Sequence, residues 1–277
     1  MININEKLNI LYYNGSTYTD YTNELAEYGR DSATITLAST DSIYVGFYKP
    51  INTFYLYLTT ANTNTIAMTL QYWNGSAFAA PVGFYNDTNG LKRSGFIRWD
   101  RNQVAEAKTT INASERYWYK IDVDTDTTEM IIAGLNILFS DDQDLKSEVP
   151  SIDKMIPDGF TDHILSHVAA RNELIRDLRS DGRYKEDLST GKLKDITAFD
   201  LLDISQVKLA STYLALSKIF LNSSDDPLDT YNEKSKVYKT HYTSTMNMFY
   251  LNVDEDDDGI QDTSEELDQN SPQLARR

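Results

Sequence analysis

The residues that most clearly suggest chemistry in this sequence are regularly spaced carboxylates near its C-terminal end. Asp254, Asp256, Asp258, Asp262 and Glu265 occupy positions 1, 3, 5, 9 and 12 of a D-x-D-x-D-G-x5-E pattern, with Gly259 at the sharp turn and the carbonyl of Ile260 as a further ligand. Hard oxygen ligands at this spacing suit Ca²⁺. Gln261 stands where such loops usually carry an apolar residue, so a solvated acidic tail is the alternative. The segment is therefore a candidate calcium loop, and Ca²⁺ is the only cofactor that the sequence suggests.

A second pair of candidate ligands, His163 and His167, stands four residues apart on a predicted helix and could face a metal together. No third ligand follows at a spacing typical of zinc sites, and no Glu follows His163 as a zinc protease requires. We therefore expect these histidines to be exposed or to face a partner, without a metal.

No residue pattern marks an active site. Ser151 and Lys154 match the S-x-x-K of acyl-transfer enzymes by letter only, because the companion motifs are absent. There is no P-loop, dinucleotide fingerprint or nucleophile elbow. A glycosidase needs only two carboxylates that are close in space, so a polysaccharide hydrolase is a lesser alternative. We predict that the protein is not an enzyme.

The net charge of the chain limits the kinds of partner that it can bind. The 277 residues carry 42 acidic and 26 basic side chains, a formal net charge of −16, and contain no cysteine. Such a surface repels nucleic acid and anionic membranes, so wrapping DNA through its phosphates is excluded. No apolar run is long enough to span a bilayer, and no secretory signal pattern is present at the N-terminus.

The elements that must position these residues change in type near residue 150. Residues 1–140 contain runs that alternate polar and apolar residues, around 34–37, 54–58, 66–70, 117–123 and 130–138, as half-buried strands do. Asn14-Gly15 and Asn74-Gly75 each separate aromatic runs and predict hairpins. The run from Tyr12 to Tyr18 is echoed from Tyr72 to Phe78, by convergence or by duplication. This part predicts an antiparallel β-sandwich.

The rest of the chain predicts an acidic linker at 141–159 and a helical module at 160–250, followed by the acidic loop and tail at 251–277. We expect Thr161 to cap a first helix that ends at Gly182, and residues 183–194 to form a loop. A short helical turn should lie at 198–202. Residues 207–221 are apolar nearly all round and should form the central helix. Asp226-Pro227 should start a long helix with Tyr231, Tyr238, Tyr242, Met246 and Phe249 packing on one face. The predicted fold class is α+β, an N-terminal antiparallel β-sandwich followed by a small α-helical bundle.

The aromatic residues of the first part have two interpretations. Aromatic faces on a β-sandwich can stack on sugar rings, which makes Trp73 and Trp99 candidate glycan-facing residues. Large aromatic side chains more often fill a core or a cross-strand pair, and we favour that interpretation.

Three segments of the β-region resemble a β-sandwich found in virion proteins of tailed phages, particularly baseplate and tail components. They are Tyr72-Trp73-Asn74-Gly75-Ser76, Ser94-Gly95-Phe96-Ile97-Arg98-Trp99 and Arg116-Tyr117-Trp118-Tyr119-Lys120-Ile121.

The helical part resembles the head-to-tail adaptor (connector) proteins of tailed phages. The resemblance rests on 160–164, on 207–214, on Asp226-Pro227 with its long helix, and on the acidic turn at 254–259 ahead of a basic end. It implies a bundle that docks beneath the portal protein and forms a homo-oligomeric ring, with 267–277 as the docking tail. Leu267, Leu274, Arg276 and Arg277 would make the portal contact. The large N-terminal β-module departs from minimal adaptors and would be an outward decoration.

The resemblance implies a structural virion protein at the phage neck, assembled in the host cytoplasm between the portal and the tail or tail-terminator proteins. An acidic lumen would let DNA pass without specific binding. The alternative is a carbohydrate- or host-binding module of the tail or baseplate.

Overall fold

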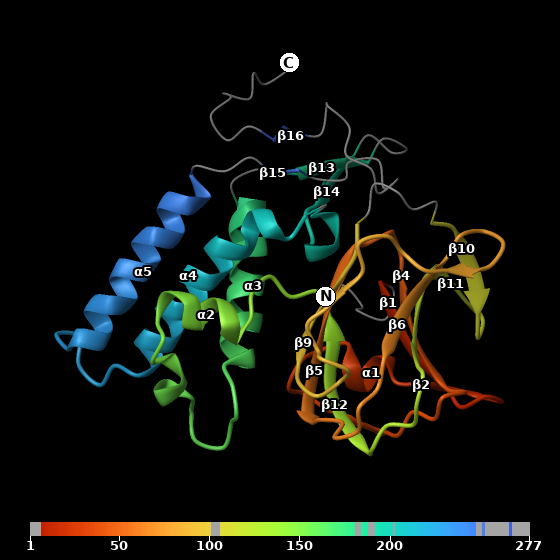
Figure 1. The fold of residues 1–277 in the computed structure, drawn as a ribbon. Coiled ribbons are helices and arrows are strands. Elements are labelled where there is room, and N and C mark those ends of the chain that lie inside the picture. The colour runs from red at the N-terminus through yellow and green to blue at the C-terminus, as the bar shows by residue number, and fades with distance from the viewer. Residues whose placement is uncertain are drawn as a thin grey trace. The chain divides into compact units, whose positions relative to one another are not determined.

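The computed structural model describes residues 7–100, 106–180, 184–187, 192–201, 203–247, 251–252 and 266–267. These residues fall into two compact units, whose boundary lies between Ile137 and Leu138. The N-terminal unit consists mainly of strands and the C-terminal unit mainly of helices, so the predicted α+β fold class is confirmed (Figure 1).

The larger sheet of the N-terminal unit is antiparallel and has seven strands in the order β2-β1-β4-β11-β6-β7, with β10 paired to β11. These strands are β1 (Leu8–Tyr13), β2 (Tyr18–Asp20), β4 (Ser42–Phe47), β6 (Met68–Trp73), β7 (Phe78–Ala79), β10 (Lys108–Ile111) and β11 (Ser114–Val123). The second antiparallel sheet has the order β3-β12-β5-β9-β8. Its strands are β3 (Ala33–Ile35), β5 (Thr53–Thr60), β8 (Tyr85–Asn86), β9 (Gly95–Arg98) and β12 (Met130–Asn136), and a short helix α1 (Thr22–Leu25) completes the unit.

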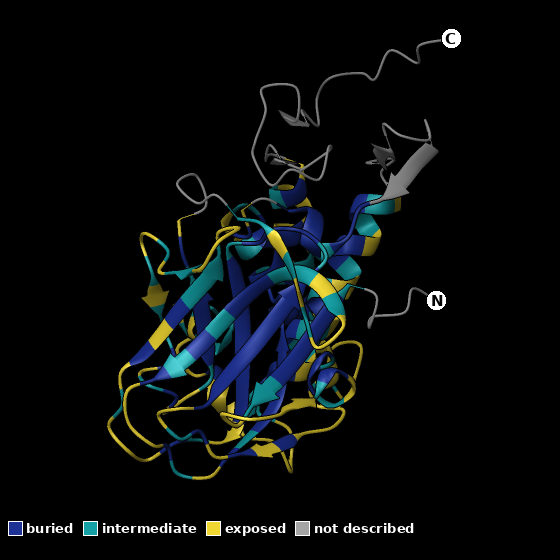
Figure 2. Ribbon diagram, turned by 90° about the vertical axis from the view of Figure 1, so that its right-hand side faces the viewer, coloured by how far each residue is buried: buried dark blue, intermediate teal, exposed yellow. Residues whose placement is uncertain are grey.

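The two sheets pack face to face and form the predicted sandwich. Phe47 of one sheet stacks on Phe54 of the other, with ring centroids 6.4 Å apart. The amide of Asn86 in β8 donates to the sulfur of Met68 in β6 over 3.7 Å. Figure 2 shows the resulting band of buried strand residues, with exposed residues gathered in the loops.

Both predicted Asn-Gly hairpins are confirmed, and they are built alike. The Asn14 side-chain oxygen accepts from the backbone N–H groups of Ser16 and Thr17 between β1 and β2. Asn74 accepts from the two equivalent N–H groups between β6 and β7. Gly15 and Gly75 follow at φ values of 82° and 95°, which glycine adopts without a steric penalty.

The C-terminal unit contains α2 (Asp142–Glu148), η3 (Ile152–Met155), α3 (Ile164–Ser180), η4 (Ala198–Asp200), α4 (Ser205–Asn222) and α5 (Thr230–Met246). Helix α4 packs against α2, α3 and α5, and it is buried around most of its circumference, as predicted. On α5, Tyr242 and Met246 are buried and Tyr238 stacks on Phe220 of α4 at 5.5 Å, which confirms the packing face for these three residues. Tyr231 also stacks on Phe220, but it is 43% exposed. Phe249 lies outside the described residues.

Residues 141–159, expected to be a linker, instead form α2 and η3. The acidic residues that suggested a solvated connector cap a helix: Asp141 is the N-cap of α2, and Asp141 and Asp144 form a reciprocal capping box. Leu145 and Ile152 are fully buried. Carboxylates at a helix start are favourable because they face the positive end of the helix dipole.

Three local predictions in the helical part are wrong. Thr161 does not cap α3, which begins at Ile164, because Asp162 accepts the Ile164 N–H instead. Helix α5 begins at Thr230 rather than at Asp226-Pro227, since the side chain of Asp229 accepts the Asn232 N–H. The expected loop at 183–194 contains an antiparallel pair, β13 (Tyr184–Asp187) with β14 (Lys192–Asp195). A further short pair joins β15 (Leu251–Asn252) to β16 (Glu266–Leu267).

Candidate functional site

The C-terminal unit contains a buried polar network, of which the sequence pattern marked only the two histidines. His167 of α3 lies between Asp142 of α2 and Ser140, which precedes α2. Its Nε2 is 3.0 Å from Asp142 Oδ1 and its Nδ1 is 2.9 Å from Ser140 Oγ. Ser140 Oγ is also 2.8 Å from Ser211 Oγ of α4. Because a carboxylate only accepts, Nε2 of His167 donates to Asp142. The network thus joins α2, α3 and α4.

His163 directly precedes α3 and extends this network. Its backbone N–H lies 3.3 Å from both oxygens of Asp142, and its ring Nε2 donates to the carbonyl of Ile152 at 3.2 Å. Burial by itself would raise the pKa of Asp142, but the hydrogen bond and charge of His167 outweigh it and hold that pKa below its ordinary value. Asp142 therefore remains ionised at neutral pH.

The expectation that His163 and His167 are exposed or face a partner is wrong. Both are buried, 2% and 1% exposed, since their polar atoms find partners inside the unit. Ser140, His167 and Asp142 have the connectivity of a nucleophile, base and carboxylate. Ser140, however, is 0% exposed, so a substrate has no access to its hydroxyl in this arrangement. The geometry is that of a network that holds three helices together.

A cavity of about 430 Å³ adjoins this network in the same unit. It is lined by Met155, Ile156, Pro157, His163, Ser166, Ile219, Asn222 and Ser223. Apart from His163, which is engaged with Ile152 and Asp142, the lining offers no titratable side chain. The cavity therefore has room for a small molecule but no set of residues that would carry out acid–base chemistry.

A cluster of opposite charges ties the long helices together. Glu173 of α3 accepts from Lys218 of α4 and from Lys239 of α5, the latter at 2.7 Å. Burial would raise the pKa of Glu173, but the two lysines lower it to about 2. One carboxylate thus joins three helices.

The surface of the helical unit carries exposed apolar side chains. Ten large apolar side chains are exposed in the part of the chain that the structure describes, and seven of them belong to this unit. They are Phe160, Leu165, Leu209, Leu221, Leu228, Tyr231 and Val237. Leu228, in the turn between α4 and α5, is 88% exposed. Single exposed apolar side chains are normal on a folded protein, and a contiguous patch of them marks a surface that binds another protein.

The two candidate glycan-facing tryptophans have different environments. Trp99 is 3% exposed and packs against Phe54 and Tyr119 in the core of the sandwich, so it cannot present a ring face to a sugar. That assignment is wrong for Trp99, because the residue lies where the two sheets meet. Trp73 is partly exposed at the end of β6 and packs edge-to-face on Phe78.

The candidate calcium loop, with Asp254, Asp256, Asp258, Ile260, Asp262 and Glu265, lies outside the described residues. The same holds for Leu274, Arg276 and Arg277 of the expected docking tail, and only the backbone of Leu267 is described, as part of β16. Within the residues that are described, no three His, Cys, Asp or Glu side chains are grouped so that they could bind a metal ion.

No family model and no curated protein matches this chain. Among the helices that the structure describes, none has both the length and the apolar character required to cross a membrane. The function therefore has to be inferred from the geometry of the two units.

Proposed function

We propose that this chain is a structural protein of a tailed-phage virion, a head-to-tail adaptor that forms a ring between the portal protein and the tail. The helical unit would make the contacts within the ring and with the neighbouring proteins. The sandwich would be carried as a decoration.

The observation that carries the proposal is the set of seven exposed apolar side chains on the helical unit. Leu228, Leu221 and Val237 would gain stability if another apolar surface covered them, because removing apolar area from water is favourable. An assembly subunit needs such residues, since they are covered when copies meet.

Charge supports the same role. A conduit for DNA should not bind phosphate, and a net charge of −16 provides repulsion rather than attraction. The expected docking tail ends in Arg276 and Arg277, which carry the opposite sign and would suit an acidic pocket on the portal.

The test replaces one exposed apolar residue on each unit with the same acidic residue. Val237→Asp on α5 removes an expected assembly contact, and Val82→Asp in the sandwich unit is the matched control, because the two valines are 51% and 49% exposed. Phage genomes that carry each variant would be propagated, and joined heads and tails would be counted by electron microscopy. We expect separated heads and tails for Val237→Asp and normal particles for Val82→Asp.

Gold labelling of assembled particles with an antibody against residues 34–118 tests the position independently. Label around the head–tail junction is the expected result. Label at the distal tip of the tail, or normal particles with both Val237→Asp and Leu228→Asp, would overturn the adaptor assignment.

A further inference from the structure

The outer face of the seven-stranded sheet, away from the sandwich core, carries a continuous diagonal of aromatic rings. It starts on the β1–β2 hairpin with Tyr13 and Tyr18, whose centroids are 4.7 Å apart. Tyr44 in the central strand β4 lies 5.7 Å from Tyr18 and 5.7 Å from Phe78 of β7. Trp73 follows at 5.4 Å from Phe78. We name these five residues the aromatic diagonal.

The two echoed hairpins supply the ends of this diagonal at equivalent positions. Tyr13 pairs with Tyr18 across the first hairpin, and Trp73 pairs with Phe78 across the second. The hairpins lie at opposite edges of the sheet, and both direct their aromatic pair toward Tyr44. The sequence echo is therefore a structural echo, in which two similar hairpins flank one surface.

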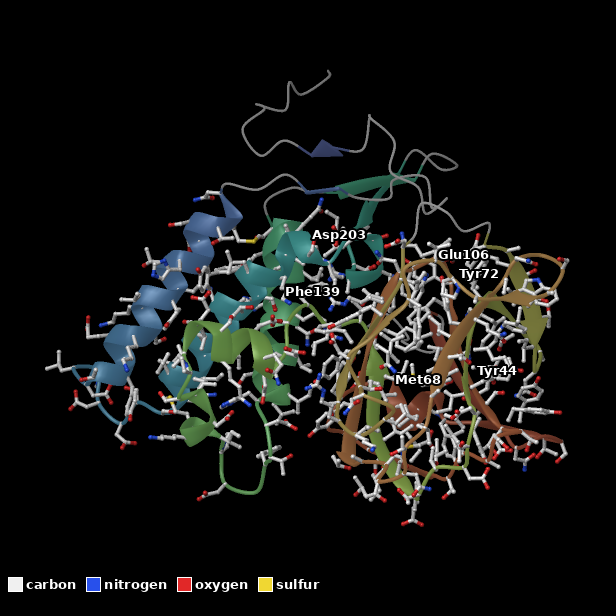
Figure 3. All side chains as sticks on the ribbon, viewed as in Figure 1. Tyr44, Met68, Tyr72, Glu106, Phe139 and Asp203 are labelled. Atoms are coloured by element: carbon white, nitrogen blue, oxygen red, sulfur yellow. The ribbon has the colours of Figure 1, made fainter. Side chains whose placement is uncertain are left out.

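The sheet register shows that this surface is not the sandwich core. Met68, on the core face of β6, reaches the opposite sheet, whereas Tyr44 lies on the side of its sheet away from that second layer (Figure 3). Trp118 lies beside Tyr44 on the same face, 1% exposed, with its ring over Gly46. A Cβ at Gly46 would come within 2.6 Å of the Trp118 ring, so this glycine lets the indole lie flat on the sheet. Tyr44 and Trp118 form the floor, and the hairpin residues form the partly exposed rim.

Hydrogen-bonding side chains line one side of the diagonal. The register places Ser42 opposite Asp122, Tyr44 opposite Lys120, and Lys120 opposite Gln71, all on the outer face. The Ser42 hydroxyl donates to Asp122 at 2.6 Å, and Lys120 pairs with Asp122 at 2.8 Å. The side chains of Lys120 and Asp122 are 23% and 24% exposed, so both can still contact solvent or a ligand.

Flat aromatic rings beside a row of donors and acceptors match the chemistry of a sugar chain. The C–H groups on one face of a sugar ring pack on the electron-rich face of an aromatic ring, while the hydroxyl groups at its edge need both donors and acceptors. Nucleic acid is disfavoured by the net charge of −16, because its phosphates would be repelled. The row of polar side chains beside the rings supplies the donors and acceptors that sugar hydroxyls need, and a second copy of the chain is the alternative that the experiment tests.

We propose that the aromatic diagonal binds a polysaccharide chain, which lies across the outer face of the sheet from the β1–β2 hairpin to the β6–β7 hairpin. Tyr18, 38% exposed, and the partly exposed Trp73 provide the stacking faces at the two ends. Lys120, Asp122 and Gln71 hydrogen-bond to the sugar hydroxyls between them. This binding is independent of the adaptor role, because every residue involved belongs to the sandwich unit.

The test measures binding of the purified chain to an array of bacterial capsular and O-antigen polysaccharides. Affinity for any glycan that binds is then measured by isothermal titration calorimetry, whose signal does not depend on Trp73. Tyr18→Ala and Trp73→Ala should each weaken binding at least about tenfold, as loss of a stacking face at a binding hot spot does. Tyr85→Ala is the matched control: Tyr85 is 54% exposed but lies on β8 of the other sheet, and its loss should leave the affinity unchanged.

Folding is checked separately, so that a loss of binding cannot be a loss of structure. Gln71→Ala removes a hydrogen-bonding group without removing a ring. It should weaken binding and leave the midpoint of the unfolding transition unchanged. The proposal is overturned if no array polysaccharide binds, or if Tyr85→Ala weakens binding as much as Tyr18→Ala. It is also overturned if sedimentation shows self-association that Tyr18→Ala abolishes, because the face would then serve a second copy of the chain.

Discussion

The link that Glu173 makes between α3, α4 and α5 gives the most direct prediction of stability. The pKa of Glu173 is about 2 in the folded protein, against an ordinary value of 4.5. Acting in full, this difference would stabilise the folded helical unit by about 3.4 kcal/mol, at 1.36 kcal/mol for each pH unit. The side chains of Glu173, Lys218 and Lys239 are 19%, 26% and 44% exposed, so solvent screens part of the interaction. We therefore expect Glu173→Gln to lower the free energy of unfolding by about 1–2 kcal/mol at pH 7.

The effect should depend on pH in a defined direction. Because the folded pKa is lowered, the stabilisation is complete above about pH 4.5 and is lost as the pH falls toward 2. The native protein and Glu173→Gln should therefore differ in stability at neutral pH and converge in acid. Glu233→Gln is the matched control, since its pair with Lys236 is within one helix and both side chains are at least 60% exposed. That variant should lose no more than about 0.5 kcal/mol.

Two optical signals report separately on the unfolding of the two units. All three tryptophans of the chain lie in the sandwich unit, so their fluorescence follows its unfolding in urea. Circular dichroism at a helix wavelength follows the helical unit. Glu173→Gln should shift the second transition and leave the first in place. An equal loss of stability in Glu233→Gln, or a difference between the native protein and Glu173→Gln that persists unchanged at pH 2–3, would refute the reasoning.

Three further outcomes are expected. Gly46→Ala should lower the free energy of unfolding of the sandwich unit, followed by tryptophan fluorescence, by about 1–3 kcal/mol, because the added Cβ would meet the Trp118 ring at 2.6 Å. Asp229→Ala should lower the midpoint of the dichroism-detected transition of the helical unit, since it removes the N-cap of α5. If the acidic loop binds Ca²⁺, adding Ca²⁺ should raise the thermal midpoint of the native chain, and the double variant Asp256→Ala and Asp258→Ala should abolish that rise; no rise in the native chain would leave the solvated-tail interpretation standing.

A strand with one wet face is revealed by its alternation, whereas β5, buried over residues 53–58, was predicted from its aromatic and leucine residues. β6 and β11 alternate because their sheet buries one face, and the runs at 66–70 and 117–123 predicted both. β4 was not predicted, although it is the centre of the sheet. All six of its residues, Ser42–Phe47, are buried, because the sandwich core covers one face and the aromatic diagonal covers the other. A strand buried on both faces loses the alternation by which it would be recognised.

The predictions of where helices begin were wrong for a different reason. Several neighbouring residues could each serve as the N-cap. Around α5 the chain offers Asp225, Asp226 and Asp229, and the choice falls on the one whose carboxylate meets the N–H groups of the first turn. Asp226-Pro227 has the right composition, but it lies in the preceding turn, where the N–H groups of Asp225 and Asp226 themselves point at Asp229. Composition gives the set of candidates, and only the path of the backbone selects among them.

The spacing of His163 and His167 drew attention to the pair, but their partners Ser140, Asp142 and Ser211 had no sequence signal because they come from separate elements. Asp142 looked like part of an acidic linker, yet its charge is what allows two histidines to be buried: it accepts from the ring of His167 and from the backbone of His163. The hydroxyl of Ser140 then contacts the remaining ring nitrogen, and Ser211 contacts Ser140. A polar residue in a predicted connector is thus the partner that a buried imidazole requires. The pairing also explains why the acidic segment is ordered against the helices, since a buried histidine without Asp142 would lose its acceptor inside the unit.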